Sequence, residues 1–405
     1  MWVRLVVGPR AYRRAVRILH TSDWHLGRSF HREGLISAQA SYVDHLLDVV
    51  EREQVDLVVV AGDVYDRALP QVDAVRLADE AFARLAASRA RVVVTSGNHD
   101  SAQRLGFGSR LMDAAGVHVR TDASGVARPV LLQDAHGPVA VYGLPYLDPQ
   151  LLREPWDLPG RSHEAALSEA MRRVRADLAQ CPPGTRSVVL AHAFVAGCAP
   201  SDSERDISVG GVSMVSSSVF YGVDYVALGH LHGSQVLGDA VRYSGSPLAY
   251  SFSEADHRKG SWLVDLDAGG YAAAEFVEAP VPRALAVLRG DLETLLRDPA
   301  LAGHESSWLQ VTLTDDVRPM RAMARLRDRF PHTLSLAFDP ANPPEPISPA
   351  TRRLGRTDHD ITQEFVADLR GRPASETEST LLREAVDACC EDPEVDALVT
   401  SGVDE

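Results

Sequence analysis

Five short segments in the first 232 residues carry side chains of the kinds that bind divalent metals. Each segment follows a short apolar run, and none of them contains a thiol. Imidazole, amide and carboxylate ligands without thiolate suit borderline metals such as manganese, iron or zinc. The candidate ligands are two Asp, one Asn and four His, namely Asp23, His25, Asp63, Asn98, His192, His230 and His232.

This ligand set predicts two-metal hydrolysis. Two metals about 3.5–4 Å apart can share a carboxylate, clamp a phosphate diester and polarise a water molecule. Asp63 follows Gly62 at the end of an apolar run and is the candidate bridging ligand. His99 directly follows Asn98, so it is the candidate group for stabilising developing charge or protonating the leaving oxygen. Asp100 is expected to hold that imidazole in one tautomer.

Alternating strands and helices are expected to position these segments. Strands are predicted over residues 16–20, 55–61, 91–95, 139–144, 187–191 and 223–228, and helices over residues 38–53, 72–88 and 163–179. Two further β-rich stretches, residues 241–243 and 262–266, are expected to complete a second sheet. The alternation predicts a layered α/β domain whose site lies at the carboxyl ends of the strands.

The pattern changes after residue 281 to a compact βαβαβ unit. Its strands are predicted over residues 284–289, 308–314 and 333–338, and its helices over residues 291–297 and 318–329. The proline-rich residues 342–349 are typical of a linker. Helices follow over residues 362–370 and 376–388. The second of them carries an apolar stripe of Leu381, Leu382 and Val386, which either folds back on its own domain or docks on a partner.

Length, composition and charge limit the class of protein and its partners. A chain of 405 residues is too long for one ordinary core, and its apolar share of 45% is typical of a globular protein without membrane helices. The net charge of −15 at first argues against a nucleic-acid partner. Residues 341–405, however, hold 15 acidic and 6 basic residues and contribute −9 of that charge. The four cysteines show no zinc-finger spacing, which favours reduced thiols in the cytoplasm.

The five segments resemble those of the calcineurin-like metallophosphoesterases, in which D-x-H, G-D, G-N-H-D, a single H and G-H-x-H follow one another. Residues 19–28, with the sequence LHTSDWHLGR, are similar more narrowly to the SbcD family of nuclease subunits. So are Ser203-Glu204-Arg205, Gly210-Gly211, residues 243–247, residues 251–254 and Lys259-Gly260. The resemblance extends over nearly the whole chain from Val16.

The resemblance implies a fold, an activity and partners. The fold is an α/β (α+β layered) metallophosphoesterase sandwich of two β-sheets flanked by helices, with a small βαβαβ capping domain and C-terminal helices. The activity is manganese-dependent double-strand exonuclease and single-strand or hairpin endonuclease action on DNA, in repair, recombination or replication. The expected partner is an SbcC-like SMC-type ATPase in a heterotetramer with two copies of each subunit, which includes a homodimer of the nuclease subunit.

Carried over by position, the resemblance also implies the roles of the ligands. One metal, most simply Mn²⁺, takes Asp23, His25, Asp63 and His232. The other takes Asp63, Asn98, His192 and His230, with His99 as the catalytic imidazole. The implied domains are residues 16–281 for the nuclease, 282–340 for the capping and DNA-binding domain, 341–360 for a linker and 361–405 for the partner-binding helices.

Other interpretations stay open. A different phosphoesterase acting on phosphoproteins or small nucleotides would need the same ligands, and a DNA-end-binding scaffold could retain them without catalysis. The chain lacks a G-x-x-x-x-G-K phosphate loop, so ATP hydrolysis is not expected from it. Residues 1–15 depart from the family pattern and are expected to be an extension outside the working protein, with Val16 read from a GUG start codon.

Overall fold

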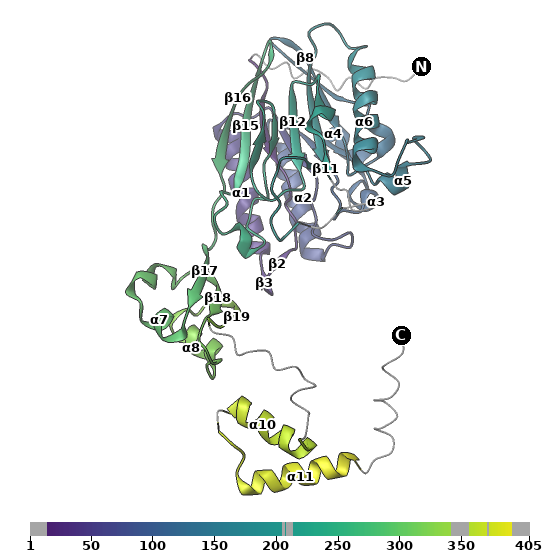
Figure 1. The fold of residues 1–405 in the computed structure, drawn as a ribbon. Helices are drawn as coiled ribbons and strands as arrows, with labels where there is room; N and C mark the ends of the chain where they lie inside the picture. Colours follow the sequence, from purple (N-terminus) through teal and green to yellow (C-terminus); the bar gives the residue numbers. More distant parts are fainter. Residues whose placement is uncertain (1–13, 205–206, 208–213, 342–355, 371, 391–405) are drawn as a thin grey trace. The chain divides into compact units, whose positions relative to one another are not determined.

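The computed structural model describes residues 14–204, 207, 214–341, 356–370 and 372–390. Most of the predicted extension over residues 1–15 and most of the predicted linker lie outside these residues, as do Arg205, Gly210 and Gly211. The chain divides into two compact units, residues 1–339 and 340–405 (Figure 1). Among the described residues, no helix combines the length and apolarity needed to cross a bilayer.

Two six-stranded mixed sheets form the larger part of the first unit, which confirms the predicted fold class. The prediction that residues 262–266 join residues 241–243 in a second sheet was wrong, because the strand containing residues 262–266 pairs with the strand at residues 17–21 in the first sheet. The first sheet has the order β16-β15-β1-β4-β5-β6, with β1 Arg17–Thr21, β4 Leu57–Ala61, β5 Arg91–Thr95, β6 Val117–Arg120, β15 Gly260–Asp267 and β16 Gly270–Glu278. The second has the order β13-β14-β12-β9-β8-β7, with β7 Val130–Asp134, β8 Gly137–Gly143, β9 Arg186–His192, β12 Tyr225–Gly229, β13 Gln235–Leu237 and β14 Val241–Tyr243.

Helices cover the outer faces of these sheets. They are α1 Ile36–Arg52, α2 Val72–Ala87, α3 Ala102–Leu105, α4 Ser109–Ala115, α5 Pro149–Leu152 and α6 His163–Leu178. Short paired segments complete the domain: β2 Ser29–Phe30 with β3 Glu33–Gly34, and β10 Phe194–Val195 with β11 Met214–Val215.

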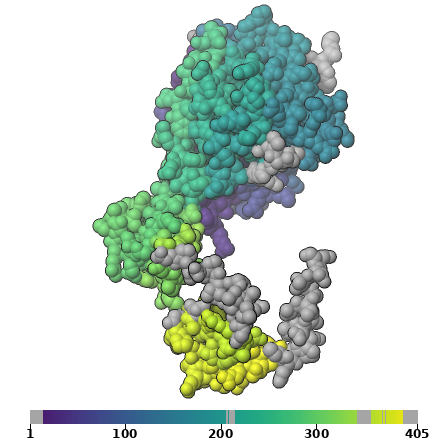
Figure 2. All heavy atoms as spheres, viewed as in Figure 1, coloured from purple at the N-terminus to yellow at the C-terminus, as the bar shows by residue number. Residues whose placement is uncertain are grey.

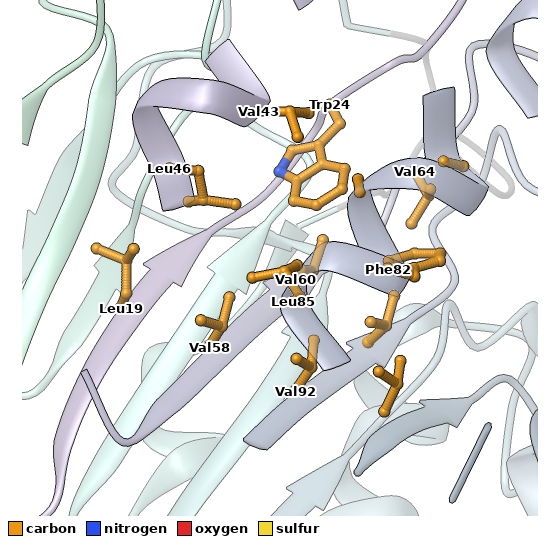
Figure 3. Packing of buried hydrophobic residues seen from close by; sticks show 14 of the residues in the cluster. Leu19, Trp24, Val43, Leu46, Val58, Val60, Val64, Phe82, Leu85 and Val92 are labelled. Carbon is orange, nitrogen blue, oxygen red and sulfur yellow. The ribbon is translucent and has the colours of Figure 1, made fainter. Parts of the chain in front are cut away.

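Three apolar layers hold the domain together. One lies between the two sheets and includes Val59, Val93 and Leu190. A second packs α1 and α2 on the first sheet, where Trp24 and Leu46 are buried with the side chains of β4 and β5 (Figure 3). A third packs α6 on the second sheet. Because β4 is covered on both faces, every residue of it is buried, which explains its unbroken apolar sequence.

Five strands carry the motifs, and within each sheet they run parallel to one another: β1, β4 and β5 in the first, β9 and β12 in the second. Their carboxyl ends therefore lie at one edge of each sheet, and the chain turns sharply there. Asp23, His25, Asp63 and His230 all have positive φ angles, of 53°, 45°, 46° and 102°. Non-glycine residues seldom adopt this conformation, and such strain gathers at functional sites.

A three-stranded parallel sheet forms a small domain at the end of the first unit. Its elements are β17 Leu285–Gly290, α7 Leu292–Arg297, β18 Trp308–Leu313, α8 Ala322–Arg329 and β19 Thr333–Phe338. The predicted helix over residues 318–329 was wrong at its start, because Arg321 adopts a left-handed conformation and α8 begins only after it.

The small domain packs on the β2–β3 hairpin of the larger domain. Phe30 of that hairpin stacks on Trp308, with ring centroids 5.4 Å apart. Phe252, in the 3₁₀ turn Phe252–Glu254, contacts the same Phe30 ring at 4.9 Å. Figure 2 shows the purple hairpin beside the green surface of the small domain.

The second unit contains α10 Asp358–Arg370 and α11 Glu376–Cys390. An ion pair between Arg370 and Glu378 and a hydrogen bond between Gln363 and Ser379 join the two helices. Phe365, Leu369 and Leu381 remain exposed on this helical pair.

We expect Phe330→Ala to destabilise the small domain by about 3–5 kcal/mol, because the ring is fully buried and its loss leaves a cavity. Differential scanning calorimetry of the full chain should show the corresponding transition at a lower temperature. Val287→Ala on the exposed face of β17 is the control and should change little. Equal effects of the two substitutions would contradict this account of the domain core.

Candidate metal centre

The fold brings all seven predicted ligands to one place, where the carboxyl ends of the two sheets meet. Asp23 follows β1, Asp63 follows β4 and Asn98 follows β5. His192 ends β9, and His230 follows β12. Asp23, His25 and His232 form one group whose potential ligand atoms all lie within 4.8 Å of one another, and Asp23, Asp63 and His192 form another.

Two glycines permit this close approach. A Cβ atom on Gly97 would lie 2.1 Å from Oδ1 of Asp63, and one on Gly62 would lie 2.2 Å from Nδ1 of His192. Gly62 also has a φ angle of 87°, which side chains rarely tolerate. The glycines before Asp63 and Asn98 are therefore needed for the two loops to meet.

Asp63 lies at the centre of the group. Its Oδ1 accepts a hydrogen bond of 2.9 Å from the backbone N–H of His99. Its Oδ2 lies 3.3 Å from Nε2 of His192 and 3.6 Å from Nε2 of His25. The carboxylate is thus placed between imidazoles from both predicted metal sites, as a bridging ligand must be.

The surroundings of His192 show that a cation fits here. Its Nδ1 lies 3.0 Å from the carbonyl oxygen of Ala61, which can only accept, so Nδ1 carries the proton. In the neutral ring Nε2 then presents a lone pair to Oδ1 of Asn98, 2.9 Å away, and to the Asp63 carboxylate. Because the Nε2 lone pair would then face two acceptor oxygens, this contact requires either a second proton on the His192 ring or a metal ion between these atoms.

The second group brings two imidazole nitrogens together. Nε2 of His25 lies 3.0 Å from Nε2 of His232, and both rings are buried. Within the described part of the chain, Nδ1 of His25 and Nδ2 of Asn98 have no hydrogen-bond partner. Imidazole, amide and carboxylate donors without thiolate form a set that suits divalent manganese, iron or zinc.

Burial and neighbouring charges shift the pKa values of the ionisable groups in the centre in different directions. Burial lowers the pKa of His25 and of His230 well below the usual range, which leaves neutral rings of the ligating form. Burial also disfavours the His192 cation, but Asp63 and Asp23 outweigh it and raise the pKa of His192 to about 9. Burial raises the pKa of Asp23 to about 6.

His99 lies beside the ligands, with its ring centroid 4.7 Å from that of His25. The predicted contact between His99 and Asp100 was wrong. Nδ1 of His99 instead donates to the carbonyl oxygen of Asp66, at 2.8 Å. Asp100 accepts from the backbone N–H groups of residues 64, 65 and 97, because its side chain turns back under the loop and ties it to the loop after β4. Asp100 thus shapes the site and does not contact the imidazole.

Several residues around the centre were missed as functional groups. Ser203, Glu204, Glu254 and Lys259 stood in the sequence segments that carried the resemblance, but no role was assigned to them. The role of the Asp66 carbonyl could not be predicted from the sequence, because every residue has a backbone carbonyl.

His20 has both ring nitrogens hydrogen-bonded, to Tyr225 and to the carbonyl of Leu228, so it is a satisfied core residue.

Comparison with known families agrees with this geometry. Residues 16–234, more than half of the chain, match the calcineurin-like phosphoesterase model. The chain therefore belongs to the calcineurin-like phosphoesterase family. Residues 281–368 match SbcD_C, the Type 5 capsule protein repressor C-terminal domain, which makes the chain an SbcD-type member of that family.

Solved structures that resemble the chain are distant. The protein TT1561 of Thermus thermophilus has 14% identity over 65% of this chain and 99% of its own, with a TM-score of 0.39. A dimetal phosphatase from Danio rerio has 14% identity over 66% of this chain and 99% of its own, also with a TM-score of 0.39. Similarity this low says nothing about the substrate.

We expect Gly97→Ala to weaken metal binding at least tenfold, because the added methyl group collides with the Asp63 carboxylate and separates the Asn98 loop from it. Isothermal titration calorimetry with Mn²⁺ measures the affinity. Gly125→Ala is the matched control, since its Cβ would meet no atom within 4 Å. Wild-type affinity in Gly97→Ala would show that the two loops need not touch.

Proposed function

We propose that the chain is the nuclease subunit of a DNA-processing complex and hydrolyses phosphodiester bonds. The observation that carries the proposal is the placement of Asp63 between two groups of imidazoles, with His99 beside it. The small domain that follows the phosphoesterase domain favours a nuclease over other members of the family, since it belongs to an SbcD-type match. The proposed actions are double-strand exonuclease and single-strand or hairpin endonuclease cleavage.

The donor set fits two divalent ions, for which we propose manganese. Asp23, His25, Asp63 and His232 would hold one ion, and Asp63, Asn98, His192 and His230 the other. When bound, such ions polarise the phosphate and activate a water molecule. Asn98 is a neutral ligand, so the site keeps less negative charge and admits an anionic diester more easily.

His99 is the proposed catalytic imidazole. Because the Asp66 carbonyl holds the proton on Nδ1, only Nε2 is left to face a substrate. In the imidazolium form Nε2–H can donate a proton to the leaving oxygen or stabilise charge on the phosphate. In the neutral form Nε2 can only accept, so this role requires the protonated ring.

Cationic groups beside His99 support an anionic substrate. Arg28 and Arg67 both approach the carboxylate of Asp66, at 3.7 and 3.3 Å, and Arg104 donates to the carbonyl of Ala68. Nη1 of Arg28 is buried and finds no hydrogen-bond partner among the described residues. These groups can bind the phosphates that flank the scissile bond, and much of the net negative charge belongs to a different part of the sequence, residues 341–405.

We expect His99→Ala to lower turnover on linear duplex DNA with Mn²⁺ by a factor of about 10²–10⁴, the usual contribution of a general acid. Metal content and melting temperature should stay at wild-type values. His136→Ala, which removes an exposed imidazole, is the control. Wild-type turnover in His99→Ala would show that another group serves the leaving oxygen.

The substrate comparison uses the wild-type protein with duplex DNA, bis-p-nitrophenyl phosphate and a phosphopeptide. Cleavage of DNA and of the small diester supports the proposal. Hydrolysis of the phosphopeptide alone would indicate a phosphatase, and DNA binding without cleavage of any substrate would indicate a scaffold.

We further propose that α10 and α11 dock on an SbcC-like SMC-type ATPase in the cytoplasm, in a heterotetramer with two copies of each subunit. Phe365, Leu369 and Leu381 supply exposed apolar side chains on these helices.

A homodimer of the nuclease subunit is supported by another group of exposed apolar side chains, at the start of α2 and around α3 and α4: Leu69, Val72, Val75, Phe107 and Leu111. Exposed apolar side chains that form a contiguous patch mark protein interfaces.

We expect removal of residues 341–405 to abolish co-elution with the ATPase in pull-downs from the native host. Mn²⁺-dependent hydrolysis of bis-p-nitrophenyl phosphate should persist, because the ligands all lie in the other unit. Full-length protein with Arg383→Ala, an exposed change on α11, serves as the control. Undiminished co-elution of the truncated chain would rule out docking through these helices.

A further inference from the structure

Lys259 is the only lysine among the 405 residues, and it is buried beside the candidate metal centre, with 7% of its surface exposed. Its ammonium group has three hydrogen-bond partners. They are the carbonyl oxygen of His232 at 2.9 Å, Oγ of Ser246 at 3.0 Å and the carboxylate of Glu254. An ammonium group offers three donors, so each finds one acceptor.

The planar guanidinium of arginine does not fit this arrangement. Its donors lie in one plane and spread over a wider group, whereas these three acceptors surround a compact one. Of the 41 lysine and arginine residues in the chain, only residue 259 is a lysine. The three acceptors at residue 259 suit the compact ammonium group of a lysine.

Glu254 connects Lys259 to the ring of His232. One carboxylate oxygen contacts Lys259, and the other contacts Oγ of Ser203. The same Ser203 oxygen contacts Nδ1 of His232. A carboxylate beside an ammonium group only accepts, so the single Ser203 proton goes to Glu254 and His232 donates to Ser203.

This relay decides which ring nitrogen of His232 is free. With the proton on Nδ1, the lone pair of Nε2 points toward Nε2 of His25, 3.0 Å away, where the candidate ligands converge. The backbone of His232 is held as well. Its N–H donates to Glu204 at 2.6 Å, and its carbonyl accepts from Lys259.

We propose that Glu254 and Lys259 are positioning residues that hold His232 in the tautomer and orientation required to bind a divalent ion. Partners of this kind raise the basicity of a ligating imidazole and fix its ring. The inference rests on the proposed function, because it takes His232 as a metal ligand. Neither residue contacts the reacting atoms, so both act through His232.

The first test measures Mn²⁺ binding to the full chain by titration calorimetry and elemental analysis. Wild-type protein should bind two ions. Glu254→Gln should weaken one of them by about 10–100-fold, the usual effect of removing such a partner, and leave the other unchanged. Glu80→Gln, an exposed carboxylate on α2 that pairs with Arg84, is the matched control.

Outcomes of this test separate the two proposals. A wild-type chain without bound Mn²⁺ would contradict the proposed function itself. Two ions of wild-type affinity in folded Glu254→Gln would overturn the positioning role and leave the proposed function standing. If Glu254→Gln does not fold, Ser203→Ala removes the link to His232 and keeps the Glu254–Lys259 pair. It should weaken the same ion, and wild-type affinity there would overturn the relay.

The Mn²⁺ dependence of hydrolysis distinguishes a positioning role of Glu254 from a general loss of structure. In Glu254→Gln the Mn²⁺ concentration for half-maximal hydrolysis of bis-p-nitrophenyl phosphate should rise about 10–100-fold, while turnover at saturating Mn²⁺ returns to within a few-fold of wild type. A turnover loss that added Mn²⁺ does not restore would contradict the inference. Lys259→Arg should shift the Mn²⁺ dependence in the same direction despite its retained charge.

The single lysine also supplies a spectroscopic readout. Protein grown with lysine labelled at Cε with ¹³C gives one side-chain signal, which belongs to Lys259. Titration with diamagnetic Zn²⁺ should shift this signal as the ion held by His232 binds. A signal that stays fixed while two ions bind would show that Lys259 is not connected to the site.

Discussion

The structure of the site depends on one electrostatic constraint, which is an excess of acceptor atoms at a buried point. His192, Asn98 and Asp63 present a ring nitrogen, an amide oxygen and a carboxylate oxygen to one another, with the ring nitrogen within 3.3 Å of both oxygens. Without a cation such a group loses the hydrogen bonds that water would supply and gains none in return. A second proton on His192, whose pKa burial lowers but Asp63 and Asp23 raise to about 9, or a bound metal ion can supply that charge. The fold must therefore hold these groups at the separation that such a charge requires.

The packing of the two sheets face to face holds these ligand atoms in place. The apolar layers behind the site are buried and keep the carboxyl ends of β4, β5, β9 and β12 at fixed positions. Turns with positive φ at Asp23 and Asp63 then direct the side chains inward. Each such turn costs about 1–3 kcal/mol, so it persists only where the surrounding packing enforces it.

The histidines of the centre are oriented by two different means. His192 and His99 donate to the backbone carbonyls of Ala61 and Asp66, which depend only on the path of the backbone. His232 relies instead on the side chain of Ser203 and, beyond it, on Glu254. A backbone carbonyl survives most substitutions, whereas a side-chain relay does not. The orientation of His232 is therefore more sensitive to side-chain substitutions than that of His192 or His99.

The residue pattern along the chain was enough to predict a layered α/β domain, the seven candidate ligands and the buried strands, while the two-sheet sandwich was predicted from the family resemblance that the motifs carry. Alternating apolar runs and ligand-type residues are local patterns, and periodicity records them directly. The start of α8 was missed because the left-handed Arg321 has no residue-type signal. The partners of His99 and His232 were decided only by tertiary structure. Asp100 is adjacent to His99 in sequence, yet its side chain turns to the backbone, while Asp66 and Glu254 come from distant positions. Adjacency in sequence does not determine which donor meets which acceptor, since that depends on how loops from separate strands pack at one edge.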